Sequence, residues 1–139
     1  MLSVAPKPLV SSFALDSSAI IALLNKETGA DRVRPLLAES AISTVNIAEV
    51  ATKLVDWDID VGELSALLIE GKVEIVPFTE AQARLCGGLR RSTRSRGLSL
   101  GDRACLALAR ERGLTAVTAD AAWVGATDVP VLPIRPTKA

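Results

Sequence analysis

The chain has 139 residues, the length of one ordinary globular domain. Lysine plus arginine and aspartate plus glutamate number 16 each, so the net charge of zero points neither toward nucleic acid nor away from it. Because the chain contains no histidine, imidazole acid–base catalysis, histidine-activated nucleophiles and the commonest zinc ligands are excluded.

The rest of the composition predicts an aliphatic core in a cytoplasmic protein. Hydrophobic residues make up 49% of the chain and aromatic residues only 3%. Cys86 and Cys105 are far apart and lack a CxxC spacing, which favours reduced core thiols. No run approaches the roughly 20 apolar residues that a membrane span needs, and Asp16 interrupts the first apolar run before a signal peptide could form.

In chain order, residues 1–9 contain two prolines and no periodicity, which predicts an extended or disordered leader. Residues 10–136 are expected to form one domain, and residues 137–139 a short tail. No internal repeat or low-complexity linker divides the chain.

Strands and helices are expected to alternate along this domain. Short apolar or β-branched runs predict strands at residues 13–15, 41–44, 73–76, 115–118 and 129–134. Helical spacing and capping residues predict helices at residues 17–24, 30–37, 45 to about 57, 61–70, 79 to about 96, and from residue 99 through at least 109. Strands that alternate with longer helical segments favour an α/β fold with a mostly parallel sheet covered on both faces.

Four acidic residues lie at or near ends of these elements. Asp16 follows the first strand and Asp120 follows the fourth. Glu49 lies in the second turn of the helix after the second strand, and Asp102 lies in the first turn of a helix that is apolar nearly all round. Because the carboxyl ends of parallel strands share one edge of a sheet, these carboxylates are expected to converge there.

Such a cluster predicts a divalent cation. Like charges a few Å apart disfavour one another's charged form, and a cation relieves that conflict. Carboxylates are hard oxygen ligands, so Mg²⁺ or Mn²⁺ is favoured over Zn²⁺. One or two such ions can activate water and stabilise a phosphoryl displacement without histidine.

Each acid also has a purely structural alternative. Asp16 could cap a helix, Asp102 could be the acidic partner of a capping box with Ser99, and Asp120 could close an Asx turn. Glu49 lies close to the apolar stripe of its helix and has no capping role, so a site is favoured there.

Four segments built around these acids resemble the motifs of PIN-domain ribonucleases of the VapC toxin type. They are residues 14–24, 42–50, 98–110 and 116–123, in the order in which the family has them. The chain departs from the family pattern in its leader and in Arg103, which places a cation beside an acid.

The resemblance implies a PIN-like three-layer sandwich with a central, mostly parallel sheet flanked by helices. It also implies an Mg²⁺- or Mn²⁺-dependent endoribonuclease that binds RNA, is usually a homodimer, and is inhibited by a cognate antitoxin covering or entering the site. The metal-site and catalytic acids would be Asp16, Glu49, Asp102 and Asp120. The supporting hydrogen-bonding residues would be Ser17, Asn46 and Thr118.

A basic run is a weaker candidate for RNA binding. Its members are Arg90, Arg91, Arg94 and Arg96. Arginine suits phosphate oxygens, but a solvated face that complements a helix C-terminus explains the run equally well.

Two other functions compete with a nuclease. A non-catalytic PIN-like module could bind a partner protein or peptide through the acidic pocket, although acids at all four positions argue against that degeneration. A response-regulator receiver needs an acidic pair after its first strand, and Asp16 stands alone there.

Overall fold

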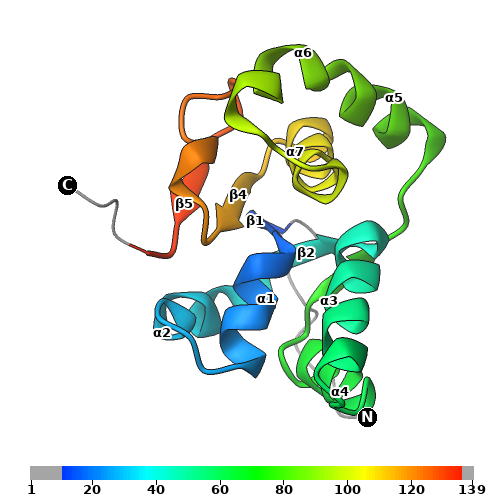
Figure 1. The fold of residues 1–139 in the computed structure, drawn as a ribbon, viewed down its shortest axis with the longest axis vertical. Coiled ribbons are helices and arrows are strands. Elements are labelled where there is room, and N and C mark those ends of the chain that lie inside the picture. The colour runs from blue at the N-terminus through cyan, green and yellow to red at the C-terminus, as the bar shows by residue number, and fades with distance from the viewer. Residues whose placement is uncertain (1–10, 136–139) are drawn as a thin grey trace, which may run out of the picture.

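The structure is a computed structural model that describes residues 11–135, so the expected leader and tail lie outside the described residues. Five short strands form one sheet with helices on both faces (Figure 1). The strands are β1 (Phe13–Leu15), β2 (Ser40–Ser43), β3 (Glu74–Val76), β4 (Thr115–Thr118) and β5 (Val131–Pro133). The helices are α1 (Ser17–Leu24), α2 (Ala30–Val33), α3 (Thr44–Asp56), α4 (Gly62–Glu70), α5 (Glu80–Gly88), α6 (Arg90–Thr93) and α7 (Leu100–Arg112).

The sheet has the order β3-β2-β1-β4-β5, and every strand pair is parallel. The chain moves outward from β1 to β2 and β3, then returns to add β4 on the other side of β1. The strand order therefore reverses between β1 and β4. In open α/β sheets, binding sites form at the carboxyl ends of the strands at such a reversal.

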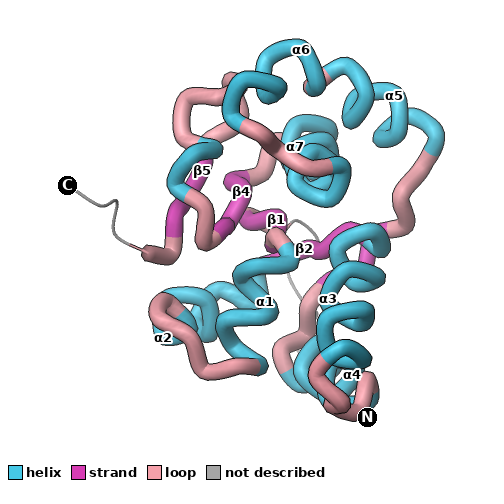
Figure 2. Tube along the Cα trace, viewed as in Figure 1, coloured by secondary structure: helices cyan, strands magenta, loops and turns pink. Residues whose placement is uncertain are grey.

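Helices α1 to α4 cover one face of the sheet, and α5 to α7 cover the other (Figures 1 and 2). The three central strands each direct an alanine toward the α7 layer and a larger residue toward the α1–α4 layer. These neighbouring pairs are Ala14 and Leu15, Ala41 and Ile42, and Ala116 and Val117. Since side chains alternate across a strand, the small residues let α7 approach the sheet closely. The expected three-layer α/β sandwich is confirmed.

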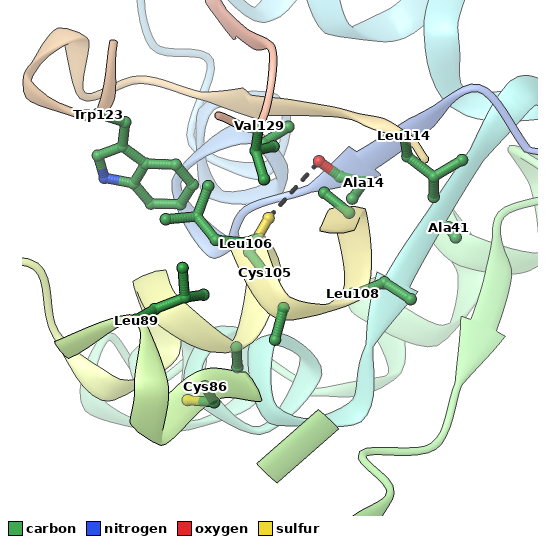
Figure 3. Packing of buried hydrophobic residues seen from close by; sticks show 14 of the residues in the cluster. Ala14, Ala41, Cys86, Leu89, Cys105, Leu106, Leu108, Leu114, Trp123 and Val129 are labelled. Carbon is green, nitrogen blue, oxygen red and sulfur yellow. Dashed lines mark hydrogen bonds between the residues drawn. The ribbon is translucent and has the colours of Figure 1, made fainter. Parts of the chain in front are cut away.

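Helix α7 is the centre of the second layer (Figure 3). Its residues from Ala104 to Ala109 are all buried, as their nearly uniform apolar character predicted. Cys105 and Cys86 are unpaired and buried in the core, and the Cys105 thiol donates to the Ala14 carbonyl over 3.6 Å. The helix ends at Gly113, whose φ of +67° is a left-handed conformation that favours glycine.

Several element boundaries differ from the sequence predictions. The expected helix over residues 30–37 ends at Val33, and a 3₁₀ helix (Arg34–Glu39) carries Pro35, which lacks the N–H that an α-helix needs. The expected helix over residues 79–96 is divided into α5, α6 and a 3₁₀ turn (Arg94–Arg96). Gly87 and Gly88 end α5, because glycine is a poor residue in a helix interior.

The remaining boundary changes are small. Strand β2 begins at Ser40, β3 begins at Glu74, and β5 covers only Val131–Pro133 of the expected residues 129–134. Ser43, one of the two expected caps of α3, accepts from the Val45 N–H over 3.2 Å. Among residues 11–135, no helix combines the length and the apolar character that crossing a bilayer requires.

Candidate active site

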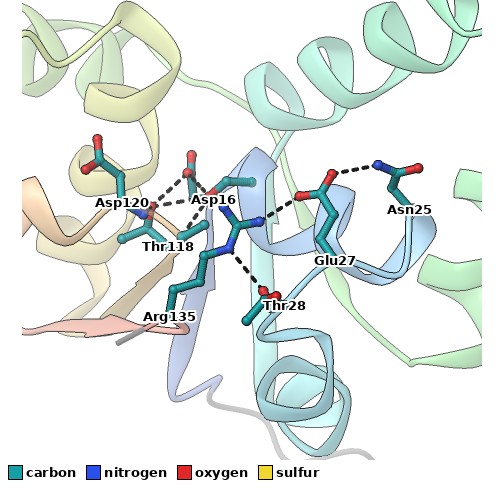
Figure 4. Close-up of polar contacts among 9 residues, drawn as sticks. Asp16, Asn25, Glu27, Thr28, Thr118, Asp120 and Arg135 are labelled. Atoms are coloured by element: carbon teal, nitrogen blue, oxygen red, sulfur yellow. Dashed lines mark hydrogen bonds and ion pairs between the residues drawn. The ribbon is translucent and has the colours of Figure 1, made fainter. Parts of the chain in front are cut away.

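Asp16 lies directly after β1, at the reversal of strand order. Its backbone N–H donates to the Val117 carbonyl of β4 over 2.9 Å, which fixes the residue between the two strands. The side chain is 4% exposed and makes no cap hydrogen bond to α1, so the capping alternative is wrong for its carboxylate. Instead, Oδ2 accepts from the Ser18 hydroxyl over 2.6 Å and from the Thr118 hydroxyl over 3.0 Å (Figure 4).

The other oxygen of Asp16, Oδ1, is buried without a hydrogen-bond partner among the described residues. An unpaired buried carboxylate oxygen is costly, because nothing replaces its lost hydration. Burial raises the pKa of Asp16 from 3.8 to about 7, Ser18 and Thr118 oppose the rise, and the negative charges of Asp102 and Glu49 add to it. A cation next to Oδ1 would remove this cost.

Glu49 faces Asp16 from α3 and is held in place by two polar neighbours. Its Oε1 accepts from the Ser17 hydroxyl over 2.5 Å and from the Asn46 side-chain amide over 3.1 Å. Asn46 is fully buried and also donates to the Gly101 carbonyl over 3.1 Å, which ties α3 to α7. Ser17 and Asn46 thus hold the carboxylate, the supporting position that the family resemblance implied.

Gly101 is the residue that lets Glu49 lie here. A Cβ atom at position 101 would be only 2.1 Å from either carboxylate oxygen of Glu49. Real side chains do not approach so closely, so any other residue at 101 would displace the carboxylate. Gly101 therefore leaves the space that the Glu49 carboxylate occupies between the first turn of α7 and the second turn of α3.

Asp102 combines the two roles considered for it. Its Oδ2 accepts from the Ser99 N–H over 2.8 Å and its own N–H donates to the Ser99 hydroxyl over 3.1 Å, which completes a capping box. The same side chain lines a pocket with Asp16 and Glu49. Burial raises the pKa of Asp102, the Ser99 hydrogen bonds lower it, and the charges of Glu49 and Asp120 raise it further.

Asp120 lies at the same edge of the sheet but does not line this pocket. Its Oδ1 accepts from the Ala122 N–H over 2.9 Å, so the Asx-turn alternative describes its side chain. Its own N–H donates to the Thr118 hydroxyl over 3.1 Å (Figure 4). The structure therefore brings three of the four acids into one pocket and leaves Asp120 beside it.

The pocket has a volume of about 450 Å³ and lies between α1, α3 and the first turn of α7. Its acids share the cavity without meeting at a point. No group of three or more histidine, cysteine, aspartate or glutamate side chains in the described range is arranged to hold a metal ion. Mg²⁺ needs few direct protein ligands because it retains several waters. The oxygen-only donors and the unpartnered Oδ1 of Asp16 therefore fit a hard divalent cation.

The basic run lies outside the pocket. Arg90, Arg91 and Arg94 are exposed on α6 and the turn after it. The Arg96 guanidinium donates to the carbonyls of Ala122 and Val124, so this member holds the loop that follows Asp120. Arg103, the cation next to Asp102 in the sequence, instead donates to the Cys86 carbonyl over 3.0 Å.

Sequence reasoning missed Ser18 and Gly101. The Ser18 hydroxyl makes the shortest hydrogen bond to Asp16 and also accepts from the Ala119 N–H over 2.9 Å, which joins the loops after β1 and β4. A serine two residues after an aspartate at a helix N-cap position is a signal that could have indicated this bond. The role of Gly101 depends on a contact between two helices, and no local signal announces it.

The chain is an all-parallel α/β protein with a carboxylate pocket at its strand-order reversal. The family model for the PIN domain matches residues 13–127, and the chain belongs to the PIN domain family. The likeness that the four acidic segments indicated is thereby confirmed. A search of curated protein sequences found no match to the chain.

Three solved structures with the same fold come from toxin–antitoxin proteins. A chain of a toxin–antitoxin complex from Klebsiella pneumoniae has 21% identity and a TM-score of 0.72, with 91% of this chain and 100% of that chain covered. VapC20 of Mycobacterium tuberculosis, a toxin that cleaves the sarcin-ricin loop, has 21% identity and a TM-score of 0.71, with 88% and 100% covered. A chain of DNA-bound VapBC from Salmonella typhimurium has 19% identity and a TM-score of 0.67, with 91% and 100% covered. At identities this low, the structural likeness establishes a shared fold alone.

Proposed function

We propose that this chain is an Mg²⁺- or Mn²⁺-dependent endoribonuclease that acts in the cytoplasm as the toxin of a toxin–antitoxin pair. The observation that carries the proposal is the Asp16 carboxylate, which is buried, half-unpartnered and directed into a pocket with Glu49 and Asp102. A buried carboxylate without a cation partner is costly in a purely structural protein. The PIN family and the toxin–antitoxin origin of similar structures support this interpretation.

Asp16, Glu49, Asp102 and Asp120 are the residues proposed to hold one or two ions. A bound divalent cation supplies a more acidic water and stabilises negative charge on a phosphodiester. Asp120 belongs to this set by its place in the family motif and by its electrostatic effect on Asp102, although its carboxylate now caps a turn.

The protein's own contribution is to hold these acids in position. Ser18 and Thr118 fix one oxygen of Asp16 and leave the other free. Ser17 and Asn46 hold Glu49 by hydrogen bonds to its Oε1, and the capping box holds Asp102 at the start of α7. Since the chain has no histidine, carboxylates of the pocket and water are the groups proposed to transfer protons during hydrolysis.

We also propose an antitoxin and a second copy of the chain as protein partners. The antitoxin follows from the similar chains, whose structures were solved within toxin–antitoxin complexes. The homodimer follows from the family resemblance. Arg90, Arg91 and Arg94 are proposed to contact RNA phosphates, because they are exposed and arginine pairs well with phosphate oxygens.

The test is cleavage of a structured RNA by the purified protein with Mg²⁺, with Mn²⁺ and with EDTA. Replacement of Asp16 by Asn should lower the cleavage rate by about 100-fold or more, because it removes a negative ligand charge. Asp58→Asn is the matched control, because Asp58 is exposed and has a φ of +56°, a conformation that asparagine tolerates. Equal cleavage by wild type and Asp16→Asn would contradict the site. No cleavage with either ion would favour the non-catalytic binding module.

A further inference from the structure

The acidic pocket contains one cation within the part of the chain that the structure describes. Lys53 lines the pocket with Asp16, Glu49 and Asp102. It lies on α3 one turn after Glu49, and residues four apart share a helix face. Its side chain is exposed, and it makes no ion pair with a carboxylate of residues 11–135. The ammonium group of Lys53 therefore has no carboxylate partner among the described residues, although carboxylates share its pocket.

Trp57 lies on the same face of α3 as Glu49 and Lys53. It follows Lys53 by four residues at the end of α3, and the Lys53 ammonium lies 5.6 Å from the centroid of its indole ring. This is a cation–π distance, so the ring helps to hold the ammonium over the helix end. Trp57 is 37% exposed, whereas Trp123 is fully buried. One of the chain's two tryptophans is therefore partly exposed to solvent, in contact with a lysine that lines the pocket.

A phosphodiester entering this pocket is repelled by the carboxylates. Asp56, a further acid of the lining, adds to this repulsion. A nearby cation lowers the cost of binding, and an exposed indole can stack a base of any sequence. Trp57 follows Glu49 by eight residues, or about 12 Å along the helix axis, so these side chains extend from the acids to the C-terminal end of α3.

We propose that Lys53 and Trp57 form the RNA-contacting strip of this site, in which Lys53 binds a backbone phosphate beside the acids and Trp57 stacks a flanking base. The inference rests on the proposed function, since it takes the pocket as the place where RNA is cut. A lysine in the last turn also complements the helix dipole. The dipole accounts for the positive charge of Lys53, but it does not account for the exposed Trp57 ring under that charge.

The first test measures RNA binding without cleavage. The Asp16→Asn protein is titrated with a fluorescein-labelled stem-loop RNA that has a single-stranded flank, in Mg²⁺ and at several KCl concentrations. Adding Lys53→Gln should weaken binding about fivefold and reduce the slope of log Kd against log salt by about 0.7, the value for one phosphate contact on a single strand. Lys53→Arg should restore the slope. Lys26→Gln is the matched control, because Lys26 is exposed beyond the far end of α1.

The second test uses the tryptophan itself. RNA should quench the emission of the Asp16→Asn protein, and Trp57→Phe should abolish the RNA-dependent change, since the buried Trp123 remains as the only tryptophan. Trp57→Leu should weaken binding about tenfold, whereas Trp57→Phe keeps a ring and should weaken it less. In the cleaving protein, Lys53→Gln should raise KM with kcat within about twofold.

These outcomes separate the inference from the proposed function. If wild type cleaves RNA but Lys53→Gln and Trp57→Leu bind and cleave as wild type does, the strip is refuted and the nuclease stands. If RNA quenches Trp57 with the expected salt slope but no cleavage occurs, the strip is supported and the nuclease fails. An unchanged tryptophan emission on saturation with RNA would refute the stacking of Trp57.

Discussion

Asp16 should make the metal-free protein less stable as the pH rises from about 4 to about 7. Burial raises its pKa to about 7 in the folded state, whereas the ordinary value of 3.8 applies to the unfolded chain. The folded state thus binds the proton more tightly, so this contribution to stability is complete below pH 3.8 and is lost as the pH rises through 7. At about 1.4 kcal/mol for each pH unit between the two values, the loss is about 4 kcal/mol.

Asp16→Asn removes this dependence because asparagine does not titrate. The free energy of unfolding of the variant should fall less than that of wild type from pH 5 to pH 8, and the variant should be more stable than wild type at pH 8. A smaller slope of the same sign remains in the variant, because burial also raises the pKa of Asp102. The buried cysteines do not contribute here, since their raised pKa values lie above this pH range.

The assay is urea denaturation in EDTA at pH 5, 6, 7 and 8, followed by tryptophan fluorescence for wild type and Asp16→Asn. Adding Mg²⁺ should stabilise wild type more at pH 8 than at pH 5, because the ion and the proton compete for the same carboxylate. The variant should respond much less. The reasoning is refuted if both proteins show the same pH slope, or if Mg²⁺ stabilises both equally.

Three further predictions concern other parts of the site and its surroundings. Gly101→Ala should change the urea midpoint little, since alanine favours helices. It should reduce RNA cleavage by about tenfold or more, because the added Cβ displaces the carboxylate of Glu49, and normal cleavage would contradict this role. Ser18→Ala should lower the unfolding free energy by about 1–3 kcal/mol and weaken Mg²⁺ binding in calorimetry, because the Ala119 N–H and the Asp16 carboxylate lose their hydroxyl partner. Ser18→Thr keeps a hydroxyl, so it should keep the stability and the Mg²⁺ affinity of wild type. Replacing Arg90 and Arg94 together by Gln should flatten the salt dependence of RNA binding by about 1.4 in the slope, and an unchanged slope would assign these residues to a solvated face.

Much of the fold could be predicted because local signals agreed with one another. The nearly all-apolar stretch of α7 indicated a helix buried on most sides, and all its residues from Ala104 to Ala109 are buried. The Ser99–Asp102 spacing indicated a capping box, which the structure contains. Boundaries failed where local signals conflicted, as at Pro35 and at Gly88, where the chain leaves the α-helix earlier than the apolar spacing suggested.

The site could be predicted less completely than the fold. Asp16 and Asp102 were placed correctly at the carboxyl edge, since strand ends in a parallel sheet share that edge. The use of each carboxylate was not predictable, because Asp102 both makes its capping bond and lines the pocket, whereas Asp120 makes its turn bond and lies beside the pocket.

The sequence therefore established the alternating strands and helices, the acids at their ends and the membership in the PIN family, because each element and each motif is formed by neighbouring residues and the motifs follow one another in a fixed order. The three-dimensional fold alone established which groups share a bond or a cavity. The hydroxyl of Thr118 reaches Asp16 across 102 residues of chain, Glu49 rests against the backbone of Gly101, and Lys53 enters the acidic pocket. These contacts join elements distant in sequence, and their distances depend on how the helices pack on the two faces of the sheet.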